Sequence, residues 1–170
     1  MRPDNAQSGF SVVAAIFVLV VLTLLAVLIA SVTGIQQASS QLDVLGVRAY
    51  HAARAGMEWG AFQVLDPGNT VACPNLPVCP SIEQNLPVAL AGSLAGFTVT
   101  VRCVATNATE GTRRVAVYDL RVTACSQADA GTGFCPNTAA ALPAEYVDRE
   151  LQASLSKCKD SALPGPCPCS

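Results

Sequence analysis

Eight cysteines are the side chains of this 170-residue chain that are best placed to do chemistry. All of them fall after position 70, at Cys73, Cys79, Cys103, Cys125, Cys135, Cys158, Cys167 and Cys169. An even number of cysteines in a small domain predicts a disulfide framework and an oxidising compartment. Their number leaves the connectivity open. We expect Cys73 to pair with Cys79 around a proline-rich loop, and Cys125 with Cys135 around a glycine-rich loop.

A metal site is not expected. The pairs Cys167-Pro168-Cys169 and Cys73-Pro74 lack the two-residue spacing of structural zinc ligands, and the chain has a single histidine. No closely spaced run of aspartates marks a calcium loop. We therefore expect neither a metal nor another cofactor.

Catalysis and nucleic-acid binding are likewise not expected. His51 is the only histidine and falls within a helical pattern, where a general base of a catalytic triad is unusual. Asp148 and Glu150 share one face of a predicted strand, where charged side chains are ordinarily solvated. Ten Lys and Arg residues against twelve Asp and Glu residues give a net charge of −2, without a basic patch for phosphates. We expect a protein that is not an enzyme.

The element that must place the cysteine-rich region is an apolar segment near the amino terminus. Residues 12–30 carry no charge, and fourteen of these nineteen residues are Val, Ile, Leu or Phe. A helix of this length spans a bilayer, and these fourteen residues favour insertion by about −4 to −8 kcal/mol. A cleavable secretory signal is the alternative, but its apolar region is shorter, about 7 to 15 residues. The segment predicts a membrane anchor that is retained.

The helical pattern continues beyond the apolar segment. Small and apolar residues recur at steps of three and four through Ala49, Ala53, Gly56 and Gly60, which is typical of one face of an amphipathic helix. No proline interrupts residues 11–65, and Asp66-Pro67-Gly68 is a strong stop signal. The pattern predicts one helix over residues 11–65 with a small-residue stripe for close packing.

The rest of the chain alternates in the manner of β-strands. Residues 97–103 and 115–124 alternate apolar and polar side chains, and residues 146–156 do so more weakly. Residues 105–112 contain Asn107 and Gly111 and predict a hairpin loop between the first two strands. We expect a three-stranded antiparallel sheet covered by the helix, which is an α+β fold.

The break at Gly9-Phe10-Ser11, at the start of the uncharged segment, resembles the leader of type IV pilins. The resemblance implies that prepilin peptidase cuts after Gly9 and leaves Phe10 as the new amino terminus. Residue 14, the fifth of the mature chain, is Ala14 where major pilins usually carry a glutamate. Because that glutamate is thought to pair with the amino terminus of a neighbouring subunit, its absence implies a subunit at the end of a fibre.

A second likeness lies late in the predicted helix. The segment Ala53-Arg54-Ala55-Gly56-Met57-Glu58-Trp59-Gly60 is similar to that of minor pilins of the PilX and MshP kind. Arg54 and Glu58 are four residues apart and are expected to pair on the helix surface. We expect Glu58 and Trp59 to fix the helix to the domain or to a neighbouring subunit.

The resemblance implies a minor pilin that acts in biogenesis of an MSHA-like type IV pilus of bacteria. It divides the chain into a leader (1–9), a transmembrane half-helix (10–33), an amphipathic half-helix (34–66) and a cysteine-rich β domain (67–170). Its expected partners are the inner membrane, prepilin peptidase and other major and minor pilins, with no nucleic acid. The anchor places the domain in the periplasm and later on the pilus at the cell surface.

Two alternatives remain open from the sequence. One is a membrane-anchored periplasmic binding module that never enters a filament. The other is the large minor pseudopilin of a type II secretion system, which carries a bigger additional domain. Neighbouring genes for short chains with the same leader would favour a pilin over the binding module.

Overall fold

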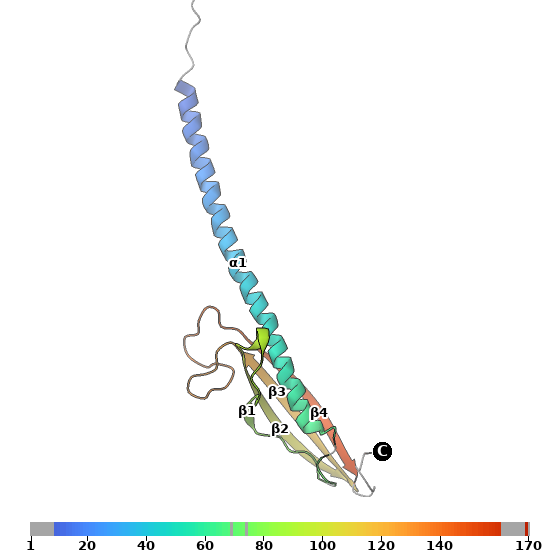
Figure 1. Cartoon of the computed structure of the whole chain (residues 1–170). Helices are drawn as coiled ribbons and strands as arrows, with labels where there is room; N and C mark the ends of the chain where they lie inside the picture. The colour runs from blue at the N-terminus through green and yellow to red at the C-terminus, as the bar shows by residue number, and fades with distance from the viewer. Residues whose placement is uncertain (1–8, 69, 74, 161–168, 170) are drawn as a thin grey trace, which may run out of the picture. The chain divides into compact units, whose positions relative to one another are not determined.

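The computed structural model describes residues 9–68, 70–73, 75–160 and 169. The elements follow in the order α1 (Gly9–Leu65), β1 (Glu83–Asn85), the short 3-10 helix η1 (Gly92–Leu94), β2 (Thr98–Glu110), β3 (Arg113–Cys125) and β4 (Asp148–Asp160) (Figure 1). The chain divides into two compact units, Met1–Asp43 and Val44–Ser170, and α1 contributes residues to both.

The first unit is the amino-terminal part of α1. Its described apolar side chains, from Val12 to Val32, are 37–68% exposed. This part of α1 is long and apolar enough to cross a membrane. Its hydroxyl groups bond within the helix: Thr23 Oγ1 donates to the Val20 carbonyl and Ser31 Oγ to the Leu28 carbonyl, both at 2.8 Å. Since lipid offers no hydrogen-bond partner, these internal bonds make the polar side chains compatible with a bilayer.

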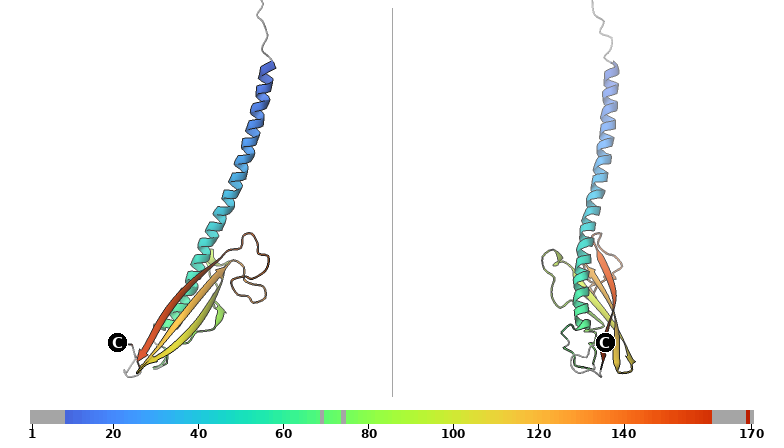
Figure 2. Two further views of the ribbon diagram at one scale, coloured as in Figure 1. Left: turned by 180° about the vertical axis from the view of Figure 1, so that it is seen from behind. Right: turned by 90° about the vertical axis from the view of Figure 1, so that its right-hand side faces the viewer.

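The second unit is a helix on a sheet. Its four antiparallel strands lie in the order β1-β2-β3-β4, and the carboxyl-terminal part of α1 runs along one face of them (Figure 2). The core between helix and sheet is formed by small residues of α1 and apolar residues of the strands. It contains Ala49, Ala52, Ala53, Val64, Val99, Val101, Cys103, Ala116, Tyr118, Leu120, Val122 and Ala124. This α+β arrangement was predicted, with one strand fewer.

Close approach of α1 to the sheet depends on Gly56. A Cβ atom there would lie 2.5 Å from Val99 Cγ1 and 2.8 Å from Val122 Cγ1, which is inside van der Waals contact. At Gly60 the corresponding distance to Val101 Cγ1 is 3.4 Å. The small-residue stripe predicted from the sequence is therefore the surface where the helix meets the sheet.

The sheet is larger than predicted, because β2 and β3 pair over their whole length from Thr98↔Cys125 to Glu110↔Arg113. The expected hairpin loop over residues 105–112 is wrong, since β2 continues to Glu110 and the turn contains Gly111 at φ +60°. Residues 104–110 are all exposed, so no apolar alternation marks them as a strand. β4 confirms the third predicted strand, and the three-residue polar β1 was not predicted.

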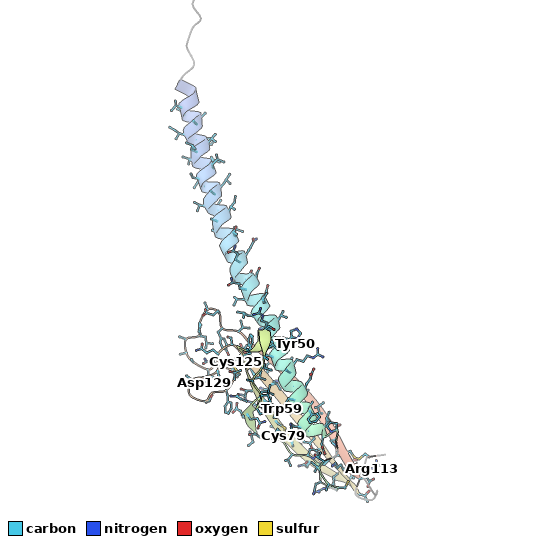
Figure 3. All side chains as sticks on the ribbon, viewed as in Figure 1. Tyr50, Trp59, Cys79, Arg113, Cys125 and Asp129 are labelled. Carbon is cyan, nitrogen blue, oxygen red and sulfur yellow. A yellow bond between two sulfur atoms is a disulfide. The ribbon has the colours of Figure 1, made fainter. Side chains whose placement is uncertain are left out.

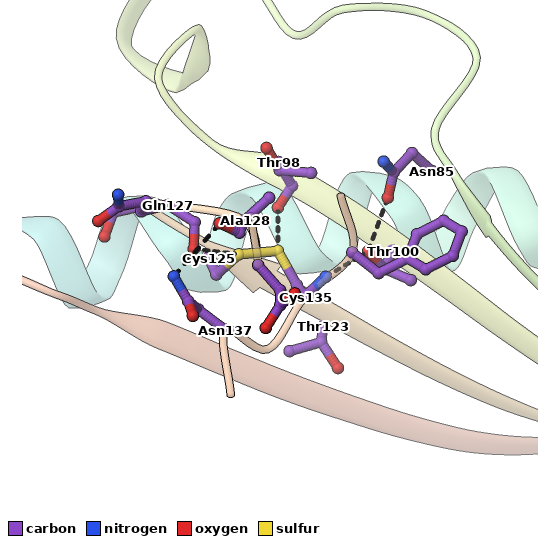
Figure 4. The surroundings of a disulfide bond; sticks show 12 residues. Asn85, Thr98, Thr100, Thr123, Cys125, Gln127, Ala128, Cys135 and Asn137 are labelled. Atoms are coloured by element: carbon purple, nitrogen blue, oxygen red, sulfur yellow. Dashed lines mark hydrogen bonds between the residues drawn. A yellow bond between two sulfur atoms is a disulfide. The ribbon is translucent and has the colours of Figure 1, made fainter. Parts of the chain in front are cut away.

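Three disulfides join described cysteines: Cys79–Cys103, Cys125–Cys135 and Cys158–Cys169. Cys73 is also disulfide-bonded. The expected Cys73–Cys79 bridge is wrong, because the loop before β1 brings the Cα atom of Cys79 to 5.6 Å from that of Cys103. The expected Cys125–Cys135 bridge is confirmed. It closes the loop between β3 and β4, and the Cys135 N–H donates to Thr100 Oγ1 of β2 at 2.8 Å (Figure 4).

Candidate functional site

The residues of the predicted processing site lie at the start of α1. Gly9 is the first residue of the helix and Phe10 the second, and the rest of the leader lies outside the described residues. Ala14 falls in the next turn, in the part of the helix whose apolar side chains are exposed. The sequence between Asp4 and Asp43 contains no charged residue. The described exposed side chains between residues 12 and 42 therefore offer apolar and neutral polar groups to whatever surrounds them.

Glu58 and Trp59 are neighbours in sequence but serve different surfaces. Glu58 Oε1 accepts a hydrogen bond from Arg54 Nε at 3.1 Å, and both side chains are more than 60% exposed. Trp59 is half-buried and packs against the core cluster that contains Val99 and Val101 (Figure 3). The predicted pair of Arg54 and Glu58 is confirmed. Trp59 thus contacts the domain itself, whereas Glu58 bonds along its own helix.

The end of α1 is fixed by residues that sequence reasoning missed. Lys157 Nζ donates to the carbonyl oxygens of Leu65 and Asp66, and the second distance is 2.9 Å. Lys159, which is only 1% exposed, donates to the Val71 carbonyl and lies 3.9 Å from Asp66 Oδ2. Cations at the carbonyl end of a helix are stabilising. β4 therefore fastens the end of α1 and the chain that leaves it.

Asp66 is the centre of this junction. Asp66 has a backbone φ of +42°, a left-handed conformation that aspartate tolerates better than most residues do. Its carboxylate accepts hydrogen bonds from the Val71 N–H at 3.0 Å and from the Thr70 N–H and hydroxyl, each at 2.8 Å. These bonds, with that of Val71 the strongest, lower the pKa of Asp66 to about 2. The stop signal at residues 66–68 located the helix end, but Lys157, which meets it, is 91 residues from Asp66 in sequence.

A second carboxylate organises the loop between β3 and β4, which we call the Asp129 loop (residues 126–147; Figure 3). Asp129 Oδ2 accepts from the Thr138 hydroxyl at 2.8 Å and the Thr138 N–H at 3.1 Å. Its Oδ1 accepts from the N–H groups of Gly131 at 2.9 Å and Thr132 at 3.0 Å. The Thr138 hydroxyl bond, followed by the backbone bonds, holds the pKa of Asp129 far below its usual range. Asp129 and the Cys125–Cys135 disulfide thus both contribute to a defined conformation of the loop.

Acid is expected to release the Asp129 loop. A carboxylate with a lowered folded-state pKa stabilises the fold above its unfolded pKa of about 3.9 and loses that contribution as the pH falls below it. Between about pH 4 and pH 2, amide exchange at Gly131, Thr132 and Thr138 should speed up relative to the intrinsic rate, as measured by hydrogen-exchange NMR. In the Asp129→Asn variant these amides should already exchange faster at pH 6, and their protection should change little on acidification. Equal protection factors at pH 6 and pH 2.5 in the wild-type chain would contradict this role.

The other candidates for chemistry are not assembled into a reactive centre. His51 is exposed, and its ring meets that of Tyr50 edge-on with the centroids 5.7 Å apart. Glu150 Oε1 lies 3.5 Å from Arg121 Nε on the face of the sheet away from α1. Within the described part of the chain, no group of three or more His, Cys, Asp and Glu side chains is arranged to hold a metal.

Two open cavities lie on the sheet. The larger, about 580 Å³, is on the face away from α1 and includes Arg102, Asp119 and Arg121. Arg102 pairs there with Glu83 and donates to the Cys135 carbonyl at 2.9 Å, so its charge is already engaged. The second cavity, about 370 Å³, lies between residues 75–79 and β2.

Together these features define a class: a helix of membrane-spanning length that carries a disulfide-bonded α+β domain on its second half. A search of family models, curated proteins and solved structures found no match to this chain.

Proposed function

We propose that this protein is a minor pilin of a type IV pilus, similar to MshP of the mannose-sensitive haemagglutinin pilus. One observation carries the proposal. The single helix α1 presents an uncharged apolar surface in the first unit of the chain, and in the second unit one side of it is buried against an antiparallel sheet. Such a helix serves two environments at once, lipid or other apolar helices at one end and its own domain at the other. The leader-like sequence around Gly9 and Phe10 adds the means of processing.

The proposed mechanism is assembly. The chain waits in the inner membrane with its amino terminus in the cytoplasm and its cysteine-rich domain in the periplasm. Prepilin peptidase removes residues 1–9, and the exposed apolar surface from Val12 to Val32 then packs laterally against other pilin helices. In a membrane the association of helices rests on packing and interhelical hydrogen bonds, for which Thr33 and Gln36 are placed at the end of the span. Packing of the half-buried Trp59 against the domain core keeps the domain on its helix during transfer to the fibre.

Ala14 assigns the subunit to a fibre end in this proposal. A methyl group cannot pair with the positive amino terminus of a neighbour, so the chain does not require a subunit below it in order to assemble. It therefore primes or caps the pilus instead of repeating along it. The membrane-anchored binding module and the type II pseudopilin are the competing assignments.

The position of the protein in the fibre tests the proposal. Immunogold labelling of sheared pili with an antibody against the folded domain should mark one end of each fibre, and deletion of the gene should lower the number of fibres. An Ala14→Glu variant should also appear along the shaft, whereas a matched Ala15→Ser variant should not. If the antibody detected the protein only in the membrane fraction and the deletion strain made a normal number of fibres, the minor-pilin proposal would be overturned in favour of the binding module.

A further inference from the structure

One edge of the sheet is unpaired over half of β2. β1 covers only Thr100 to Arg102 of β2, where Glu83, Gln84 and Asn85 are the partners. The hydrogen bonds at this edge come from odd-numbered residues of β2: the Val99 carbonyl accepts from Leu86 N–H, and the Cys103 N–H donates to the Ile82 carbonyl. By the alternation of a strand, the N–H and C=O groups of Ala105, Asn107 and Thr109 point to the same edge. Among the described residues, none bonds to these groups.

This edge lacks the features that usually keep a strand from pairing with another chain. Residues 104–109 contain no charge and no proline, and every residue from Val104 to Glu110 is exposed. Natural edges are commonly blocked by lysines, prolines or bulges. The opposite edge strand, β4, has the exposed charges Arg149 and Glu150 near one end. The open part of β2 from residue 104 to residue 109 lacks such charges.

A cavity lies directly beside the open edge. The cavity of about 370 Å³ is lined by Asn75 to Cys79 on one side and by Ala105, Asn107 and Thr109 of β2 on the other. The loop that forms its far wall is held in place by the Cys79–Cys103 disulfide and by Tyr118, whose hydroxyl donates to the Pro77 carbonyl at 2.5 Å. A strand added at the edge would place alternate side chains in this cavity.

Apolar and charged groups near the open edge define what it accepts. Val78 lines the cavity and is 78% exposed. Ile82 is 82% exposed, and Val104, which lines the larger cavity on the other face of the sheet, is 60% exposed, so apolar side chains stand in solvent near the start of the open edge. At the other end lies Arg114, which is paired in register with Thr109 and is the one charged side chain among the described residues that line the cavity. Arg114 Nη1 donates a long hydrogen bond to Asn75 Oδ1 at 3.5 Å, and no carboxylate of the described residues pairs with it.

We propose that the open edge of β2 (residues 104–110), together with this cavity, binds an extended peptide segment of another protein. The segment adds to β2 through main-chain hydrogen bonds at Ala105, Asn107 and Thr109. It places apolar side chains on Val78, Ile82 and Val104, and a carboxylate beside Arg114. This site is independent of leader processing and of fibre assembly, so it stands or fails separately from the proposed function.

Binding to a peptide library tests the site. The full chain, oxidised and reconstituted in lipid nanodiscs, is screened against phage-displayed random dodecapeptides. Enriched peptides should combine an uncharged apolar run with an acidic residue or a free carboxyl terminus, and their binding should slow amide exchange at Ala105, Asn107 and Thr109. Amidation of the carboxyl terminus distinguishes a terminal carboxylate from a side-chain carboxylate as the partner of Arg114.

Substitutions at Asn107 provide the matched pair. The Asn107 N–H points away from β3. Proline at this position therefore removes an edge N–H without removing a hydrogen bond between β2 and β3. Asn107→Pro should weaken binding at least about tenfold, whereas Asn107→Ala, which keeps the N–H, should bind as the wild type does. Arg114→Gln should weaken binding by about two- to fivefold, as loss of an exposed ion pair does. Equal melting temperatures of the three variants would show that the fold is retained.

Three results would overturn the proposal. The first is a screen that enriches no peptide over empty nanodiscs, and the second is a set of peptides that bind Asn107→Pro as tightly as wild type. The third is concentration-dependent protection of residues 105–109 without any peptide, which would identify the open edge as a contact between two copies of this chain.

Discussion

Replacing Gly56 with leucine is expected to prevent the second unit from folding. The Cβ atom alone would lie 2.5 Å from Val99 Cγ1 and 2.8 Å from Val122 Cγ1, and both valines are buried on paired strands. Neither can move aside as a flexible side chain does, so α1 must lift away from the sheet. Overpacking a core typically costs about 1 to 3 kcal/mol and occasionally more, and we expect the upper end because a leucine adds three carbons beyond the clashing Cβ atom. Circular dichroism melting of the chain in nanodiscs, with protease resistance as a second readout, measures the loss.

Two other glycines of α1 serve as controls for Gly56. A Cβ atom at Gly34 would meet nothing within 4 Å, so Gly34→Ala should stabilise the helix by up to about 1 kcal/mol. At Gly46 the nearest atom, 2.9 Å away, is the end of the Arg149 side chain, which is free to swing into solvent, so Gly46→Ala should change the melting temperature little. A Gly56→Leu chain that melts like the Gly46 variant would show that α1 is not packed on the sheet at this distance.

Removal of the Cys79–Cys103 disulfide should give the second large effect. The bridge spans 24 residues and joins the loop before β1 to a buried position of β2. Constraint of a loop of this length in the unfolded chain stabilises the fold by about 3 kcal/mol. The double variant Cys79→Ala, Cys103→Ala should therefore unfold at a lower denaturant concentration, as measured by urea titration under oxidising conditions.

Reduction of the wild-type chain gives the comparison for this variant. Because other disulfides are also lost on reduction, the reduced wild type should be less stable than the double variant. The double variant should further lose protection of the loop at residues 75–79, since this bridge helps the Tyr118 hydroxyl to hold that loop. A double variant with an unchanged urea midpoint would contradict a stabilising role for the bridge.

The anchor helix and the central strands could be predicted from the sequence, because each has a strong local pattern. An uncharged run ending before Asp43, a proline-free helix and the stop at residues 66–68 are sufficient to define α1. Apolar alternation identified β2 and β3 where one face is buried on α1. Where both faces are exposed, as in residues 104–110, the alternation disappears and the strand was mistaken for a loop.

The contacts that fix the domain to its helix depend on distant residues and could not be derived. Lys157 and Lys159 resemble solvated charges of a strand until β4 is placed beside the end of α1. Cys79 is six residues from Cys73 but pairs with Cys103, since β1 brings its loop alongside β2. Trp59 was identified through the resemblance to minor pilins. Its packing on the sheet depends on how closely α1 approaches the strands. Long-range pairing is the information that local patterns lack.

The amino terminus of the membrane-bound protein is the most direct test of the central claim that the chain is a processed pilin. Mass spectrometry of protein purified from cells with and without prepilin peptidase reads it without further assumptions. We expect a chain starting at Phe10 when the peptidase is present and at Met1 when it is absent. An intact Met1 in both strains would rule out processing and identify the protein as an unprocessed membrane-anchored module.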